Sequence, residues 1–211
     1  MTSRIRFSTA LNVFEAFQDL GRLLPRPIDD AAPLEYCRGL LGSGRPSDAT
    51  AFLAHLLPRR ETVWWARQCV GALIGPLADD PALQAAETWV REPEEEHRRA
   101  ALDVGRAADS RSPTTWLALA AGWSGGSIGA VDLIPRPPPA SACAKAANAA
   151  IVLAACAGDP RGIEARLRAC AEAGLRFAEG GEARVSVGKA AEGKSRGGSG
   201  AGSVAGAASW A

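Results

Sequence analysis

Apolar residues along most of the chain recur at the spacing of amphipathic helices. Ala10, Val13, Phe14 and Phe17 stand at positions i, i+3, i+4 and i+7, which places them on one face of a helix. Ser8 or Thr9, directly before them, is a residue type that caps helix starts. The pattern predicts a helix from about residue 10, and the same period returns in segments as far as Phe177.

Proline, glycine and capping residues indicate where the other helices begin and end. Starts are predicted at Pro33, Ser47-Asp48, Pro93, Ser112-Pro113 and Asp159-Pro160, because proline suits the first helical position and Ser or Asp suits the cap before it. Ends are predicted at the glycines of residues 42–44, at Pro58 and at Gly180-Gly181. These signals divide the chain into about seven to nine short helices.

The segment of residues 59–75, RRETVWWARQCVGALIG, is apolar on nearly all sides. Between Val63 and Ile74 only Arg67 and Gln68 interrupt the run. A helix that is apolar all round is buried against several neighbours, so we predict that this is the central helix. Alanine dominates the inward stripes and allows helices to approach closely, and we expect the large rings to fill the wider gaps. Those rings are Trp64, Trp65, Trp89 and Trp116.

Two segments depart from the helical pattern. Residues 122–140 run from a glycine-rich stretch into VDLIPRPPPAS, whose four prolines predict an extended arm on the surface. Residues 182–211 are rich in Gly, Ser and Ala, and we predict disorder because they have too few large apolar side chains to offset the entropy of ordering. Residues 1–181 are therefore expected to form a single helical domain.

Strand patterns are nearly absent from the sequence. No segment sustains the alternation of a half-buried strand, and the short stretch of residues 5–7 is the sole possible exception. We therefore predict an all-α fold, an irregular bundle of short helices followed by a disordered tail.

Charge and cysteine content exclude several classes of function. The 24 basic and 23 acidic side chains leave a net charge of +1, so no overall field favours nucleic acid or an anionic membrane. The N-terminal segment lacks the uninterrupted apolar core of an export signal. The five cysteines show no metal-binding spacing and indicate a reducing compartment, so we expect a cytoplasmic protein. Three of them, Cys69, Cys156 and Cys170, fall on apolar helical faces as inert packing.

The titratable clusters do not have the pattern of a catalytic or metal site. Glu94, Glu95, Glu96 and His97 are consecutive on a helix and so point in different directions. We interpret them as the acidic first turn of a helix, paired at i, i+4 as Glu94 with Arg98 and Glu95 with Arg99. His55 lies alone in FLAHLL, which is typical of a hydrogen-bonded helix histidine.

The glycine-rich stretch that begins at Gly122 has no signature of phosphate binding or nucleophilic catalysis. It follows a helix instead of a strand and lacks the Lys-Ser/Thr of a phosphate-binding loop. Ser124 lacks the G-x-S-x-G elbow of a serine nucleophile. We therefore predict no catalytic residues, no cofactor and no metal.

The same stretch is our candidate for a protein-interaction surface. A tryptophan beside flexible glycines and ahead of a rigid proline arm would present an apolar ring next to exposed backbone. The predicted surface comprises Trp123, Ser124, Gly125, Gly126, Pro137 and Pro138, and its partner would be another protein. The alternative is an enzyme or small-ligand-binding protein with a pocket between Ala-rich helices, near carboxylates such as Glu61 or Glu87.

The order and spacing of tryptophans resemble those of an uncharacterised family of bacterial helical proteins. The likeness rests on LLPRRETVWWARQCVGAL, AAETWVREPEEEHRRAAL and SPTTWLALAAGWSGGS with the downstream PPP, and it covers roughly residues 5–181. Some members of that family lie beside type VI secretion genes. The resemblance implies a non-enzymatic adaptor or accessory scaffold linked to a secretion system, and it implies no functional residues.

Overall fold

The computed structural model describes residues 4–27, 29–75, 77–129 and 134–186. Every regular element in these ranges is a helix, so the predicted all-α fold is confirmed, and the stretch of residues 5–7 is extended without pairing as a strand. The α-helices are α1 (Ala10–Ala16), α2 (Pro33–Gly42), α3 (Pro46–Leu56), α4 (Arg59–Ile74), α5 (Pro81–Arg91), α6 (Glu95–Ala107), α7 (Pro113–Gly122), α8 (Ala142–Cys156) and α9 (Ile163–Ala178), and the 3-10 helices are Gln18–Arg22 and Pro160–Gly162.

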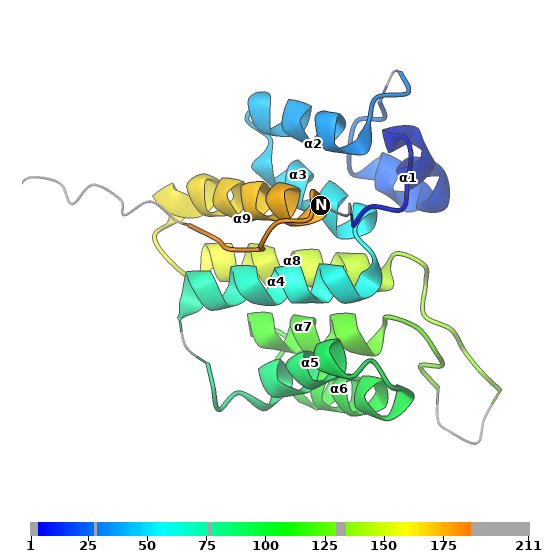
Figure 1. Cartoon of the computed structure of the whole chain (residues 1–211). Coiled ribbons are helices and arrows are strands. Elements are labelled where there is room, and N and C mark those ends of the chain that lie inside the picture. Colours follow the sequence, from blue (N-terminus) through cyan, green and yellow to red (C-terminus); the bar gives the residue numbers. More distant parts are fainter. Residues whose placement is uncertain (1–3, 28, 76, 130–133, 187–211) are drawn as a thin grey trace, which may run out of the picture.

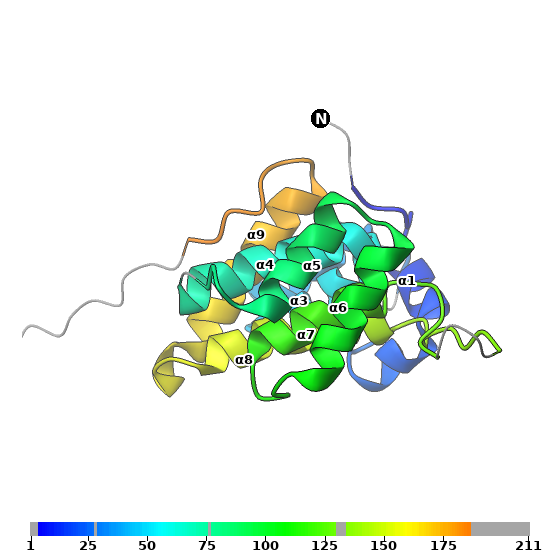
Figure 2. The ribbon, with the colours of Figure 1, turned by 90° about the horizontal axis from the view of Figure 1, so that it is seen from below.

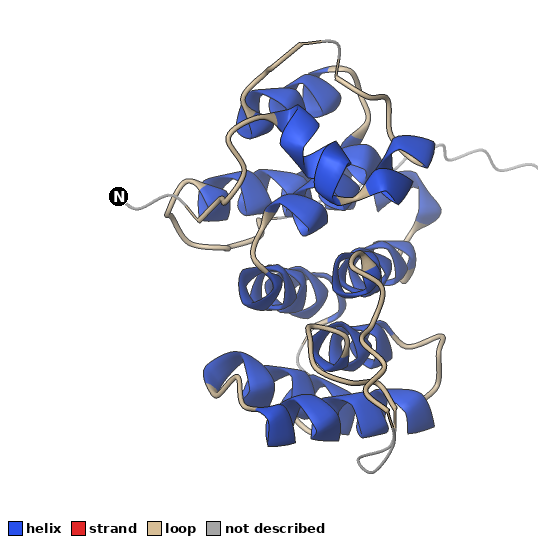
Figure 3. Cartoon of the chain, turned by 90° about the vertical axis from the view of Figure 1, so that its right-hand side faces the viewer, coloured by secondary structure: helices blue, strands red, loops and turns tan. Residues whose placement is uncertain are grey.

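The helices are stacked in tiers around α4 and α8. Figure 1 shows these two helices side by side across the middle of the molecule, with α5, α6 and α7 below and α9, α3 and α2 above. Figure 2, seen from below, shows α5, α6 and α7 covering that end of the bundle. The same tiers appear in Figure 3, where loops connect helices throughout the described chain.

The prediction that α4 is the central helix is confirmed, although α8 shares that role. α4 packs against α3, α5, α7, α8 and α9. Its Trp65 is fully buried, and the indole Nε1–H donates a hydrogen bond of 3.0 Å to the carbonyl of Cys170 on α9. One face of α4 is nevertheless open to solvent, because Arg67, Gln68 and Ala72 are half-buried or exposed.

Small residues bring the helices close together where they pack, as predicted. A Cβ built on Gly122 of α7 would lie 2.7 Å from the Cα of Leu102 on α6. One on Gly174 of α9 would lie 2.8 Å from the Trp65 ring. At such distances only glycine fits without moving a neighbour.

Most of the predicted helix boundaries are confirmed. Thr9 caps α1 through a reciprocal capping box with Asn12. Pro33 and Pro113 occupy first-turn positions of α2 and α7. Gly180, with a φ of 98°, follows α9 at its C-terminal end, where the left-handed backbone favours glycine.

Three predicted helix starts are displaced by two or three residues. Asp159 caps the 3-10 helix Pro160–Gly162, and α9 itself begins at Ile163. Ser47 and Asp48 lie inside α3, which begins at Pro46, because the proline itself takes the first helical position. Pro93 lies before α6, which begins at Glu95 with the extended residue Glu94 as its N-cap. The acidic first turn is thus Glu95 and Glu96.

The predicted burial of aromatic rings and thiols is only partly correct. Trp65 and Trp89 are buried, whereas Trp64 and Trp116 are half-buried. Cys156, predicted to be packing, is exposed at the end of α8, while Cys37, Cys69, Cys143 and Cys170 are buried. Burial raises the pKa of the Cys37 and Cys143 thiols to about 12, so these thiols stay protonated and unreactive at neutral pH.

The predicted disordered tail lies almost wholly outside the described residues, since the described part ends at residue 186. Within it, residues 182–186 are extended and Ala183 is buried.

None of the helices in the described part of the chain combines the length and the apolar character that a bilayer crossing requires.

Candidate functional site

The glycine-rich loop after α7 is held by arginine side chains. Arg59, Arg98, Arg99 and Arg106, here called the arginine cradle, donate hydrogen bonds to backbone carbonyls between Gly122 and Gly129. Guanidinium donors suit carbonyls that have no helical partner, because each offers several N–H groups in a fixed plane. The loop is therefore fixed by side chains from α4 and α6.

Arg98 is the buried member of the arginine cradle. Its side chain is only 4% exposed, it donates to the carbonyls of Gly122 and Ser127, and its charge is balanced by Glu95 at 2.6 Å. The hydrogen bond from Arg98 is also the main cause that lowers the pKa of Glu95. The predicted pairing of Glu94 with Arg98 is wrong, because Glu94 is the extended N-cap of α6 and lies outside the helix. Glu95, the first helical residue, pairs with both Arg98 and Arg99.

The residues of the predicted interaction surface differ in their exposure. Trp123 is half-buried and packs edge-to-face on Trp116, with ring centroids 6.5 Å apart. Ser124 is buried, and Gly125 is half-buried. Gly126, exposed, has a φ of 58°, and a Cβ there would lie 2.8 Å from Arg98 Nε. Trp123 thus offers one edge to solvent instead of a free ring.

The proline arm is exposed where the structure describes it. Pro137 is exposed and Pro138 half-buried, and Ile134, just before them, is 90% exposed. Residues 130–133, which the predicted arm includes, lie outside the described residues.

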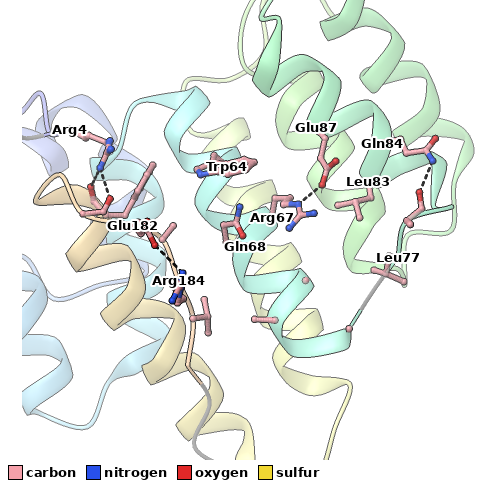
Figure 4. Close-up of a pocket in the computed structure, with 18 residues that line it drawn as sticks. Arg4, Trp64, Arg67, Gln68, Leu77, Leu83, Gln84, Glu87, Glu182 and Arg184 are labelled. Carbon is pink, nitrogen blue, oxygen red and sulfur yellow. Dashed lines mark hydrogen bonds and ion pairs between the residues drawn. The ribbon is translucent and has the colours of Figure 1, made fainter.

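A groove of about 920 Å³ runs along the open face of α4. Its floor is the stripe of α4 from Trp64 through Gln68, Gly71 and Ala72 to Gly75. One wall is α5 and the turn before it, with Leu77, Leu83, Gln84 and Glu87, and the other is the extended chain after α9, from Gly181 to Val185, with Phe177 and Arg4. Figure 4 shows this arrangement, with side chains of α4 between the two walls.

The floor of the groove lacks side chains in its middle. A Cβ on Gly71 would meet only the end of the flexible Arg67 side chain, at 3.4 Å, and one on Gly75 would have no neighbour within 4 Å. Ala72, beside Gly71, is exposed. The helix backbone is therefore accessible along this stripe, with space above it.

Polar side chains hold each wall in position. On the α5 side, Arg67 Nε donates to Glu87 Oε1 across the junction of α4 and α5, and these two side chains point toward each other in Figure 4. On the other side, Arg4 donates to the carbonyls of Phe177 (2.7 Å) and Gly181 (2.9 Å). Arg176 fixes the extended segment through the carbonyl of Arg184 at 2.7 Å.

The two carboxylates named in the alternative hypothesis both lie near this groove. Glu87 lines it directly. Glu61 lines a smaller hollow of about 280 Å³ that shares Arg4, Trp64 and Phe177 with the groove. Sequence reasoning missed Arg4, Arg184 and the role of Trp64. The only signal is the helical spacing of Gln68, Gly71, Ala72 and Gly75, and on a helix that is apolar nearly all round this spacing does not by itself show which side faces a groove.

The groove is lined by apolar, amide and charged side chains. Its described lining contains no Cys, His, Ser or Thr that could serve as a nucleophile. Glu87 accepts a hydrogen bond from Arg67, so it is engaged as an ion-pair partner. Elsewhere among the described residues, no group of three or more His, Cys, Asp or Glu side chains has the arrangement to hold a metal ion.

Each of the two histidines of the chain has a ring nitrogen within hydrogen-bond distance of a backbone carbonyl. His55 is buried, with its Nδ1 2.8 Å from the carbonyl of Ala51 and its ring edge-to-face on Phe17, as a hydrogen-bonded helix histidine should be. Burial lowers its pKa. His97 Nδ1 lies 2.9 Å from the carbonyl of Glu92, next to the start of α6.

The fold and the groove define a helical domain with one open helix face between two walls. Residues 36–178 match the DUF6931 family, a family of unknown function, and the chain belongs to that family. No curated protein and no solved structure matches the chain. The matched region contains the floor of the groove and its α5 wall, whereas Arg4 and the wall from Gly181 to Val185 lie outside it.

Proposed function

We propose that the chain is a protein-interaction module whose groove along α4 binds an extended polypeptide segment. The observation that carries this proposal is the open floor of the groove, where Gly71, Ala72 and Gly75 leave α4 accessible between two walls. Pockets for small ligands commonly span about 300–1,000 Å³, so the volume of about 920 Å³ alone does not decide between ligand classes. The floor, which follows α4 from Trp64 to Gly75, favours a chain-like ligand.

The length of the floor sets the length of segment that the groove can hold. From Trp64 to Gly75 the floor covers eleven residue steps of α4, which is about 17 Å at 1.5 Å per residue. At about 3.3 Å per residue, an extended chain of that length has about five residues.

The lining supplies both contact and orientation for such a segment. Leu77, Leu83 and Val185 line the walls and offer apolar surface. Trp64 lies half-buried at one end, where its ring can pack against an apolar side chain. The open stripe at Gly71 and Ala72 leaves room for a side chain that points at the floor.

The test fills the floor and measures peptide binding. The whole chain is immobilised and peptides are selected from a random twelve-residue phage-display library. The affinity of a synthesised winner is then measured by fluorescence polarisation. Ala72→Trp places a ring in the groove, and we expect it to lower the affinity at least tenfold. Ala165→Trp, at an exposed position of α9 outside the groove, is the matched control and should bind as the wild type does.

Other occupants give different results in the same assay. If residues 187–211 of this chain fill the groove, their removal will raise the peptide affinity, and the partner proposal is then wrong. If a small molecule is the ligand, metabolites will raise the melting temperature of the wild type but not of Ala72→Trp, while no peptide is enriched. Equal peptide binding by both tryptophan variants would also reject the groove as the site.

The family resemblance makes this proposal more specific, because it links the chain to a bacterial secretion apparatus. It predicts that the partner segment belongs to a component of such an apparatus. A synthetic peptide from that component should compete with the selected peptide for the wild-type groove and not bind Ala72→Trp. Failure of every component peptide to compete would remove the secretion link and leave the groove proposal standing.

A further inference from the structure

The segment from Ile134 to Pro139, here called the proline segment, is the most exposed apolar part of the described chain. Ile134 is 90% exposed and Leu23, the other exposed large hydrophobic residue, is 58% exposed. Pro135, Arg136, Pro137 and Pro139 are exposed as well. An isolated exposed apolar residue needs no explanation, but here one isoleucine and three prolines are exposed within six positions.

The sequence IPRPPP restricts this segment to an extended conformation. Each proline fixes its own φ near −65° and lacks an N–H donor, and each residue before a proline is excluded from the helical region. Polyproline II geometry has three residues per turn, so Ile134 and Pro137 share one face. Arg136 and Pro139 share the next face. Both faces are exposed, whereas the third face contains the half-buried Pro138.

The body of the protein holds the proline segment at Arg136. The N–H of Ile128 donates to the carbonyl of Arg136 at 2.8 Å. The N–H of Arg136 donates to Ser127 Oγ at 3.0 Å. Ser127 is itself fixed, because its carbonyl accepts a hydrogen bond of 2.9 Å from the buried Arg98. At the other end, the carbonyl of Pro139 accepts from the N–H of Ala142 at the start of α8.

This anchoring leaves the side chains free while it orders the backbone. The hydrogen bonds at Arg136 use only its main chain. Its side chain is exposed, and within the described residues its guanidinium has no hydrogen bond or ion pair. Ordering a segment before it binds lowers the entropy cost of association. The arginine cradle, through Ser127, thus presents a rigid apolar ridge with a cation beside it.

We propose that the proline segment is the ligand of a partner domain with an aromatic-lined groove that recognises polyproline II helices. Ile134 and Pro137, about 9 Å apart along such a helix, would enter two neighbouring apolar pockets. The guanidinium of Arg136 would meet an acidic side chain at the edge of the partner's groove. None of these residues lines the α4 groove, so this surface is independent of the function proposed above.

The experiment uses recombinant domains that bind polyproline. A panel of SH3 and WW domains, whose grooves are aromatic-lined, is titrated against the whole chain by biolayer interferometry. We expect at least one domain to bind, and Ile134→Ala combined with Pro137→Ala to weaken its affinity at least tenfold. Leu23→Ala combined with Pro93→Ala removes an exposed apolar residue and an exposed proline elsewhere, and it should bind as the wild type does.

Two further variants separate direct contact with the partner domain from the ordering of the proline segment. Arg136→Glu reverses the charge that meets the partner, and we expect a loss that shrinks as salt is added. Ser127→Ala removes the hydrogen-bond acceptor of the Arg136 N–H without changing the ridge, and we expect the affinity for the partner domain to fall several-fold. A free IPRPPP peptide lacks this anchor altogether, so it should also bind several-fold more weakly than the whole chain. If no domain of the panel binds, or if the control pair weakens binding as much as the ridge pair, the proline segment is only a spacer and the proposal is wrong.

Discussion

The two faces of α4 use small and aromatic residues for opposite purposes. On the packed face, Trp65 is fully buried and a Cβ on Gly174 of α9 would lie 2.8 Å from its ring. On the groove face, Trp64 is half-buried and a Cβ on Gly71 would meet only the end of Arg67. Packing therefore requires a glycine where α9 meets the packed face of α4, whereas no packing contact requires glycine at Gly71 on the groove face. Helix packing therefore does not explain why the groove face has small residues, and a binding role does.

The largest contrast is expected between the adjacent tryptophans. Trp65→Ala removes a buried ring and leaves a cavity, so the free energy of unfolding should fall by about 3–5 kcal/mol. Trp64→Ala removes a half-buried ring, and we expect a loss of at most about 1.5 kcal/mol with a marked loss of peptide binding. Urea unfolding and fluorescence polarisation measure the two effects. Similar losses of stability for both variants would show that the groove face is packed after all.

Substitution of the packed glycine is expected to give the next largest effect. In Gly174→Ala the new methyl group meets Trp65 and Leu53 Cδ1, which lies at 3.0 Å from the Cβ position. Trp65 cannot move aside without losing its hydrogen bond to Cys170. Overpacking of this kind costs about 1–3 kcal/mol, and a midpoint shift in urea unfolding would report it. A variant as stable as the wild type would place α9 farther from α4 than the structure does.

The same substitution on the groove face is expected to have the opposite sign. Gly71→Ala adds a methyl group in open space, and alanine in a helix interior is favoured over glycine by about 1 kcal/mol. We therefore expect the free energy of unfolding to rise by up to about 1 kcal/mol, again by urea unfolding. A clear destabilisation would mean that Gly71 is held by a close contact and that the floor is not open.

The pH dependence of stability is expected to come from the packed side of the molecule. Burial lowers the pKa of His55 from its ordinary 6.5, with Asp19 opposing and Lys145 reinforcing the effect of burial. The unfolded chain therefore takes up the proton first, so stability is complete above about pH 6.5 and falls as the pH drops below it. His55→Leu should flatten this decline in thermal melts between pH 7.5 and 5, while His97→Gln, at the half-buried histidine, should leave the His55-dependent decline in place.

The helices and their order could be predicted from the sequence, whereas the two sides of α4 could not. Helix starts at Pro33 and Pro113 follow from local chemistry, which the chain carries in neighbouring residues. In contrast, α4 is apolar nearly all round, so its period does not show that Trp65 faces the core and Trp64 the groove. The side that faces the core depends on where α5, α8 and α9 lie around α4, and their positions are set by contacts between distant segments.

The same limit applies to the arginines. Arg98 lies in a charged stretch that resembles a solvated helix face, yet it is buried because the loop carbonyls of Gly122 and Ser127, more than twenty residues away, need donors. Arg4 lines the groove because it joins the N-terminal segment to the end of α9. Of the residues that line the groove, only Glu87 follows from the sequence as a pocket residue, as a carboxylate near it.

The central claim is that the open face of α4 is the binding surface. The most direct measurement is a titration of the isotope-labelled chain with a peptide selected on it, followed by amide chemical shifts. We expect the largest changes at Gly71, Ala72 and Gly75 on the floor and at Val185 on the wall. Changes that are confined to the loop around Trp123, or that spread over residues remote from α4 while the floor amides stay in place, would contradict the claim.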